Sequence, residues 1–144
     1  MVERIAACPL LWRRGSLWVV LVTTRRGGRW TLPKGNLEED LSNPQVAELE
    51  AYEEAGIIGR AHGPGGRAMV RSRGRLVATE VYALVVHQLL SRWPEDGERQ
   101  RRLVRVDRLD EIPLDPTWCW CIRRLASQPT LATAPAPRKT DRSA

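Results

Sequence analysis

Apolar residues recur near the start of the chain in two runs separated by a short polar turn. The runs cover residues 4–12 and 17–25, and Arg13-Arg14-Gly15-Ser16 lies between them. Two runs rich in valine and leucine on either side of a glycine-containing turn predict a β-hairpin. A Gly-Gly pair then turns the chain, and a short segment at residues 30–32 follows and stops at Pro33. Residues 34–43 are polar and are expected to form a loop.

The pattern then changes to helical spacing. Ser42 can cap a helix, and Gln45 stands three residues later, as in a capping box. Pro44 suits the first turn of a helix, and Gly56 suits the position just after its end. The sequence therefore predicts a helix that begins near Ser42–Pro44 and ends at Ala55.

The rest of the apolar pattern predicts three more strands and a last helix. The strands are expected at residues 67–73, 75–88 and 101–107, and the helix at 114–126. Strands before and after one central helix favour an α+β sandwich with a mixed sheet over a regular βαβ array. Residues 1–127 are thus expected to form one domain. Residues 128–144 are rich in Pro, Ala and Thr without periodicity, which predicts a disordered tail.

Charge narrows the classes of partner. The net charge is +6, the isoelectric point is about 10.0, and arginine supplies most of the positive charge. Such a chain favours anionic partners, which include phosphates, nucleotides and nucleic acid. The sequence has no apolar run long enough to span a bilayer and no basic start followed by a long apolar stretch, so we expect no membrane partner and a cytoplasmic location. Three cysteines, an odd number, argue against a disulfide framework.

The predicted central helix carries an acidic cluster. Glu50, Glu53 and Glu54 stand at positions i, i+3 and i+4 and share one helix face. Adjacent carboxylates repel one another unless a hard divalent cation lies among them, and Mg²⁺ prefers oxygen ligands. Gly35 and Lys34 in the preceding loop would suit a site for metal and phosphate. The alternative is a solvated acidic helix face.

The segment 35–57 resembles the Nudix box. In words, that pattern is Gly, five residues, Glu, seven residues, Arg-Glu, a bulky aliphatic, any residue, Glu-Glu, any residue, Gly and a bulky aliphatic. The residues that fall on it in register are Gly35, Glu50, Glu53, Glu54, Gly56 and Ile57. The chain is further similar to the branch that holds diphosphoinositol polyphosphate and dinucleoside polyphosphate hydrolases, over roughly residues 2–126.

The resemblance implies a Nudix-type α/β/α sandwich with a mixed β-sheet, a central catalytic helix and a C-terminal helix. It implies metal-dependent hydrolysis of a diphosphate linkage, with Mg²⁺ or Mn²⁺ as cofactor, in a nucleotide derivative, a dinucleoside polyphosphate or an inositol pyrophosphate. Glu50 and Glu54 match metal ligands, Glu53 matches the catalytic base or a further ligand, and Gly35 matches a backbone carbonyl at the metal. The side chains that could contact substrate phosphates are Arg26, Lys34, Arg99 and Arg101.

Three positions depart from the pattern, and at one of them the small Ala51 stands in for the bulky aliphatic. Leu41 replaces the first Glu, and Leu49 replaces the Arg that orients the neighbouring glutamates in the family. Because leucine can make neither an ion pair nor a hydrogen bond, we expect reduced turnover. The alternative is a catalytically inactive Nudix-fold module that binds a nucleotide or RNA end. A third, less favoured interpretation is a basic surface that binds nucleic acid without a small-molecule site.

Overall fold

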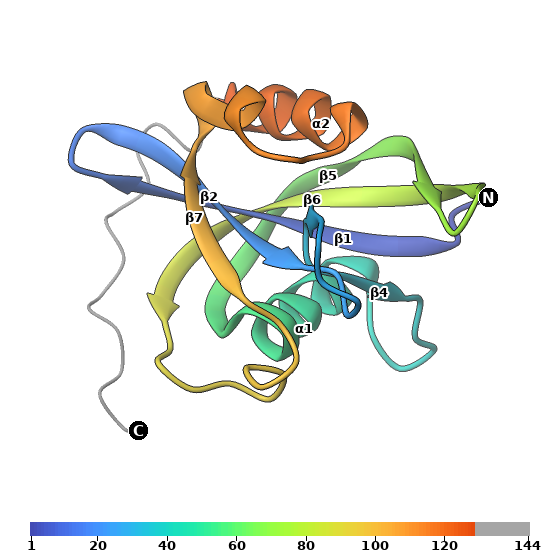
Figure 1. Cartoon of the computed structure of the whole chain (residues 1–144). Helices are drawn as coiled ribbons and strands as arrows, with labels where there is room; N and C mark the ends of the chain where they lie inside the picture. The colour runs from blue at the N-terminus through green and yellow to red at the C-terminus, as the bar shows by residue number, and fades with distance from the viewer. Residues whose placement is uncertain (129–144) are drawn as a thin grey trace.

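The computed structural model describes residues 1–128, which form one mixed β-sheet with a helix on each face (Figure 1). The elements are β1 Arg4–Arg13, β2 Ser16–Thr23, β3 Trp30–Thr31, β4 Lys34–Asn36, α1 Asn43–Ala55, β5 Ile57–Ser72, β6 Arg75–Leu89, β7 Arg101–Arg105, the 3-10 helix η1 Val106–Glu111 and α2 Pro116–Ala126.

The sheet joins segments that are distant in the sequence. Its order is β3-β2-β1-β6-β5, with β4 paired to β1 and β7 paired to β2. The β1–β6 pair is parallel, while the other pairs are antiparallel. This arrangement places the short strand β4 at the start of β1, with Gly35 opposite Ile5. The sheet therefore carries the loop glycine directly beneath the central helix.

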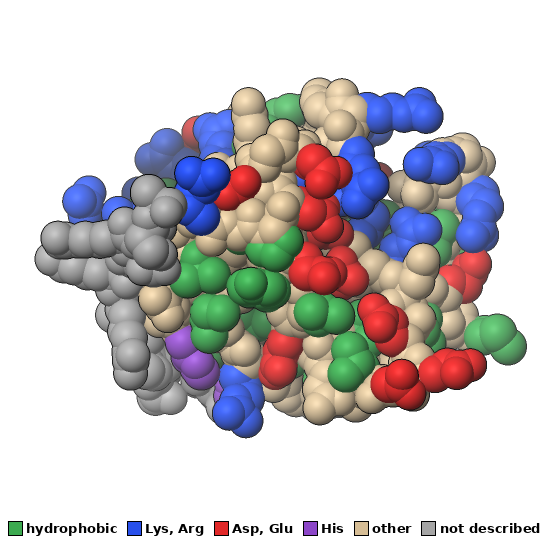
Figure 2. Space-filling model, turned by 90° about the horizontal axis from the view of Figure 1, so that it is seen from below, with side chains coloured by type: hydrophobic (Ala, Val, Ile, Leu, Met, Phe, Trp, Pro, Cys, Tyr) green, Lys and Arg blue, Asp and Glu red, His purple; other side chains and the backbone are tan. Residues whose placement is uncertain are grey.

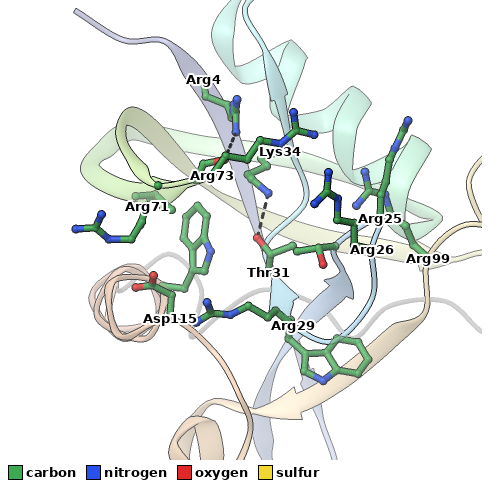
Figure 3. Close-up of a pocket in the computed structure, with 16 residues that line it drawn as sticks. Arg4, Arg25, Arg26, Arg29, Thr31, Lys34, Arg71, Arg73, Arg99 and Asp115 are labelled. Carbon is green, nitrogen blue, oxygen red and sulfur yellow. Dashed lines mark hydrogen bonds between the residues drawn. The ribbon is translucent and has the colours of Figure 1, made fainter.

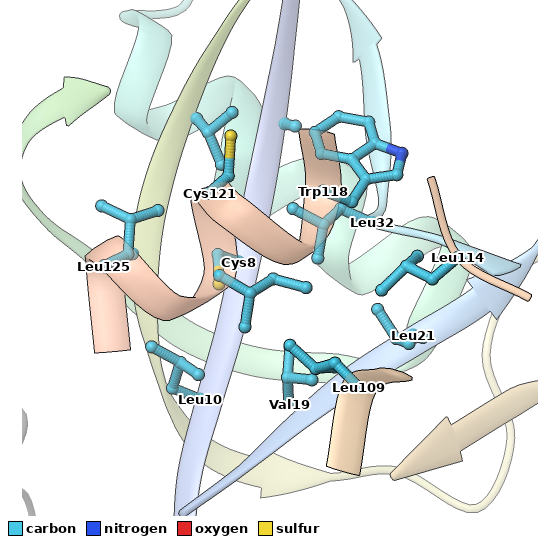
Figure 4. Packing of buried hydrophobic residues seen from close by; sticks show 14 of the residues in the cluster. Cys8, Leu10, Val19, Leu21, Leu32, Leu109, Leu114, Trp118, Cys121 and Leu125 are labelled. Atoms are coloured by element: carbon cyan, nitrogen blue, oxygen red, sulfur yellow. The ribbon is translucent and has the colours of Figure 1, made fainter. Parts of the chain in front are cut away.

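Successive side chains of the strands enter two different cores, because side chains alternate between the faces of a sheet. Along β1, Ile5 and Ala7 pack in the core beneath α1, whereas Cys8 and Leu10 pack in the core beneath α2. Figure 4 shows the second core, where Trp118 and Leu125 of α2 lie over the sheet. Each helix is thus fixed to its own face of the sheet by apolar burial.

Helix α1 has the ends that the sequence predicts. The Ser42 side chain accepts a hydrogen bond from the Gln45 backbone N–H, the Gln45 side chain accepts one from the Ser42 N–H, and Gly56 adopts the left-handed conformation with φ of 65°. Leu41 packs against the core cluster that contains Val46. Leu41 and Val46 are the residue before the cap and the fourth helical residue, which is the spacing of a hydrophobic staple.

Several boundaries differ from the predictions. Residues 34–36 form β4 rather than loop, because they pair with β1. Strand β5 begins at Ile57 rather than at residue 67, since residues 57–66 also pair with β6 across two register shifts. The hairpin of β1 and β2 is confirmed, and α2 begins at Pro116, where the Asp115 side chain accepts from the Thr117 N–H.

The predicted tail, apart from Gln128, lies outside the described residues, so the domain boundary stays a prediction. Neither the length nor the apolar content of any helix within residues 1–128 would allow it to cross a membrane.

The hydrophobic staple predicts that replacing Leu41, one of the residues that depart from the Nudix box, lowers the stability of the protein. Leu41→Glu should lower the free energy of unfolding by about 1–2 kcal/mol, because it places a carboxylate against an apolar cluster. Leu37→Glu is the matched control, since Leu37 lies in the same loop and is 43% exposed. It should change stability by no more than about 0.5 kcal/mol. Urea denaturation measures both; equal shifts would show that Leu41 does not staple the helix.

Candidate functional site

Helix α1 brings two of its glutamates against strand β4. Glu54 is buried, and the backbone N–H of Lys34 donates to its Oε1 at 3.3 Å. A Cβ at Gly35 would overlap the carboxylate of Glu50. A side chain at position 35 would therefore displace the Glu50 carboxylate from its place beside the strand. Glu50, Glu54 and the Gly35 backbone form one cluster, which we call the carboxylate site.

Burial and mutual repulsion set the protonation of the carboxylate site. Burial, together with a hydrogen bond that protonated Glu50 donates to Glu54 and the charges of Glu54, Glu53 and Glu95, raises the pKa of Glu50 to about 8. Burial also raises the pKa of Glu54, against the opposing effects of Arg99 and of the Lys34 backbone. A buried and a half-buried carboxyl group in contact favour a bound positive charge. Their oxygen atoms, with the adjacent backbone of Gly35, fit a hard divalent cation.

Glu53 holds a different position from the other two glutamates. It is half-buried and lies close enough to Glu50 for its charge to raise the Glu50 pKa. Within residues 1–128, however, no three side chains of His, Cys, Asp or Glu form a group arranged to hold a metal ion. The structure thus brings Glu50 and Glu54 together and leaves Glu53 beside this pair.

The segment between β6 and β7 caps the C-terminal end of α1. Trp93 Nε1 donates to the Glu54 carbonyl at 3.0 Å, the Glu95 N–H donates to the Glu53 carbonyl at 3.0 Å, and Arg101 Nη1 donates to the Ala55 carbonyl at 2.9 Å. Helix ends leave such carbonyls without partners inside the helix. These bonds fix residues 90–101 next to the carboxylate site.

Two arginines of this segment are held by protein groups. Arg101 stacks on the Trp93 ring at 4.3 Å and donates to the carbonyls of Ala55 and Leu90. Arg99 lies beside Glu54, with its Nη2 3.6 Å from Glu54 Oε2, and also contacts Glu95. Sequence reasoning grouped both arginines as phosphate contacts. The sequence offered no signal for the capping contacts, because they depend on where the segment folds back.

A cavity of about 700 Å³ opens beside Lys34 and Arg99. Seven arginines and one lysine line it, and Asp115 is the one acidic residue among the lining side chains. Figure 3 shows these cations around the cavity; they come from β1, the loop before β3, β4, the end of β5, the β5–β6 turn and the segment before β7. The cationic side chains of the cavity are Arg4, Arg25, Arg26, Arg29, Lys34, Arg71, Arg73 and Arg99.

The cavity contains three of the four residues predicted to contact phosphate. Arg26, Lys34 and Arg99 line it, whereas Arg101 is absent from its lining. Sequence reasoning missed Arg71, near the end of β5, and Arg73, in the turn that follows, because only the pairing of β5 with β6 brings them here. The Lys34 ammonium donates to Thr31 Oγ1 at 3.4 Å, and burial lowers the pKa of Lys34.

The acidic and basic groups occupy adjoining surfaces. In Figure 2, which views the molecule from below Figure 1, acidic side chains gather in a band across the face, with Lys and Arg side chains next to it. The shared boundary is Glu54, which touches both the Lys34 backbone and Arg99. Such an arrangement can hold a cation on one side and phosphate oxygens on the other.

The chain is similar in sequence to known proteins named as Nudix hydrolases. The chain is 36% identical over 96 residues to Nudix hydrolase 4 of Arabidopsis thaliana, which covers 65% of this chain and 46% of that protein. It is 31% identical over 111 residues to diphosphoinositol polyphosphate phosphohydrolase 3-beta of Homo sapiens, covering 73% of this chain and 65% of that protein. No model of a known protein family matches the chain.

The fold is also similar to solved structures. The crystal structure of a C. elegans Ap4A hydrolase superposes with a TM-score of 0.69 at 15% identity, covering 88% of this chain and 98% of that one. The likeness confirms the predicted sandwich. The chain spans about half the length of the first plant relatives it matches.

Protonation of the carboxylate site predicts how stability depends on pH. Between the ordinary glutamate pKa of 4.5 and about 8, the metal-free folded protein keeps a proton on Glu50 that the unfolded chain releases. The stability of the metal-free protein should therefore fall as pH rises through this window. Glu50→Gln should flatten that slope, as measured by urea denaturation in a chelator at several pH values. An unchanged slope in the variant would show that Glu50 does not titrate this way.

The two Arg-Gly turns allow an effect on ligand binding to be measured apart from an effect on stability. Arg73 at φ of 50° and Arg14 at φ of 53° both adopt the left-handed conformation before a glycine, where asparagine is preferred. Arg73→Asn and Arg14→Asn should thus be stable. Arg73→Asn alone should weaken binding of tripolyphosphate, by about three- to tenfold, because only Arg73 lines the cavity. Calorimetric titration measures this. Equal weakening by both changes would exclude a specific contribution of the turn.

Proposed function

Because the chain belongs to the Nudix hydrolase family, we propose that it hydrolyses a diphosphate linkage in a small, densely phosphorylated molecule, with Mg²⁺ or Mn²⁺ as cofactor. One observation carries the proposal: a cavity lined by eight cationic side chains opens beside a pair of glutamates, the buried Glu54 and the half-buried Glu50. Lys34 and Arg99 border both sites, so a phosphate chain bound in the cavity reaches the carboxylates.

The carboxylate site is the proposed metal site. Glu50 and Glu54 would hold the ion, with the backbone carbonyl of Gly35 beside them, and their raised pKa values mean that the ion competes with a shared proton. When bound, a divalent ion supplies positive charge to the diphosphate oxygens and lowers the pKa of a coordinated water.

The remaining roles fall to residues around the metal site. Glu53, at the edge of the pair, is the proposed base that accepts the proton of the attacking water, or a further ligand. Arg26 and Lys34 hold phosphates within the cavity and stabilise the charge of the leaving phosphate. Arg101 is left out of the proposed phosphate-binding set, because its guanidinium is stacked on Trp93 and bonded to two carbonyls.

The lining of the cavity favours some substrates over others. Its two tryptophans offer little free aromatic surface, because Trp118 is 3% exposed and the Trp30 ring already faces Arg102 at 5.8 Å. Cations, by contrast, come from every side. A compound with many phosphates and no need for base stacking fits this lining best, so we place inositol pyrophosphates first and dinucleoside polyphosphates second among the three predicted classes.

The second candidate function is a binding module without turnover. It is supported by the two apolar departures, Leu41, which packs in a core cluster, and Leu49. Even the enzyme is expected to turn over slowly, because both departures remove polar groups from the neighbourhood of the glutamates. Binding and hydrolysis therefore have to be measured separately.

The test is a phosphate-release screen over inositol pyrophosphates, dinucleoside polyphosphates and nucleoside diphosphate derivatives, with Mg²⁺ and with Mn²⁺. Glu54→Gln should lower kcat by about 100-fold or more, because even the groups that support a metal ligand contribute about 10–100-fold. Glu48→Gln is the matched control on the same helix. Glu48 accepts a hydrogen bond from the Ala61 N–H, so this change should leave kcat within about twofold. Binding without phosphate release from any compound would favour the module.

A further inference from the structure

The Glu54 carboxylate is held at both of its oxygen atoms by groups from outside α1. Its Oε1 accepts from the Lys34 backbone N–H at 3.3 Å, and its Oε2 lies 3.6 Å from Arg99 Nη2. Glu54 and Arg99 are both largely buried, with side chains 6% and 10% exposed. A charge pair this far from water is screened much less than a surface pair.

Arg99 is itself fixed in place. Its Nε donates to Glu95 Oε1 at 2.8 Å and its Nη1 donates to the Thr23 carbonyl at 3.0 Å. All three guanidinium nitrogens therefore have protein partners. Glu95 is anchored in turn, since its backbone N–H donates to the Glu53 carbonyl at 3.0 Å. The planar guanidinium is thus held through Glu95, which is bonded to the end of the same helix that carries Glu54.

No arginine or lysine of α1 can perform this task. The helix has no basic residue in its last turn, and position 49, next to Glu50, is leucine. The guanidinium reaches Glu54 instead from the segment between β6 and β7, which the capping bonds of Trp93 and Glu95 hold against the helix.

We propose that Arg99 is a positioning residue that fixes the Glu54 carboxylate for catalysis, and that it takes the place of an arginine at position 49. The proposal rests on the proposed function and assigns Arg99 a role other than phosphate binding. Cavity arginines that contact phosphate should act mainly on substrate affinity. A residue that orients Glu54 should act mainly on the chemical step, because geometry matters most in the transition state.

The kinetic test compares Arg99→Met with Arg26→Met on the substrate found by the screen. Arg99→Met should lower kcat by about 10–100-fold and change KM by less than about threefold. Arg26→Met should mainly raise KM. Arg99→Lys should give a kcat between those of Arg99→Met and the wild type, because an ammonium keeps the charge but cannot reach all three partners. Arg92→Met is the control, since the exposed Arg92 pairs with Asp96 in the same segment and lies outside the cavity. It should leave both constants unchanged.

A second measurement needs no turnover. In the metal-free protein, Arg99→Met, Glu54→Gln and the double variant form a cycle of urea denaturation midpoints, and the positioning contact predicts effects that are not additive. Additive midpoints, or an Arg99→Met variant that raises KM without lowering kcat, would overturn the proposal. If the wild type releases no phosphate from any compound, the proposed function fails, while the cycle still decides whether Arg99 holds Glu54.

Discussion

The C-terminal end of α1 is the constraint on which the site depends. An α-helix leaves its last four carbonyls without partners, and burying them unpaired is costly. Here Trp93, Glu95 and Arg101 supply donors to three of them, while the Gly56 N–H closes the helix itself. Hydrogen bonds to these backbone carbonyls therefore hold the segment 90–101 against the helix. This arrangement places Arg99 beside Glu54, and it uses the Arg101 guanidinium for hydrogen bonds to backbone carbonyls.

The carboxylate site is unfavourable for the metal-free protein. Glu50 and Glu54 lie in contact, and both pKa values are raised: that of Glu50 by burial, by its hydrogen bond to Glu54 and by neighbouring negative charges, and that of Glu54 by burial. In the neighbouring cavity, eight cationic side chains face a single acidic one, Asp115, among the lining residues. The carboxylate site would thus be stabilised by a bound cation, and the cavity by a bound anion. A divalent ion and a polyphosphate together would relieve both, so we expect each to strengthen the binding of the other.

Local signals in the sequence predicted the parts of the fold that depend on local physics. Ser42, Gln45 and Gly56 mark the ends of α1 because caps are made within a few residues, and two apolar runs on either side of a turn predicted the hairpin. Strand β4 and the first half of β5 were missed, since a Gly-containing segment becomes a strand only when a distant partner pairs with it. The same limit applies to the site: spacing on one helix predicted the glutamates, but not the convergence of Arg71 and Arg73 on Lys34.

Leu41 and Arg99 show why a match to a motif, residue by residue, understates what a fold can do. Leucine at position 41 packs in the core beneath α1, so an acidic residue there would work against the start of the helix. Leucine at position 49 removes an ion pair from the helix, yet Glu54 is still held between a guanidinium and a backbone N–H. An oriented carboxylate requires a donor at a given place, and the chain can deliver that donor from any segment that the rest of the structure holds there. The functional unit is therefore α1 together with the segment that caps it.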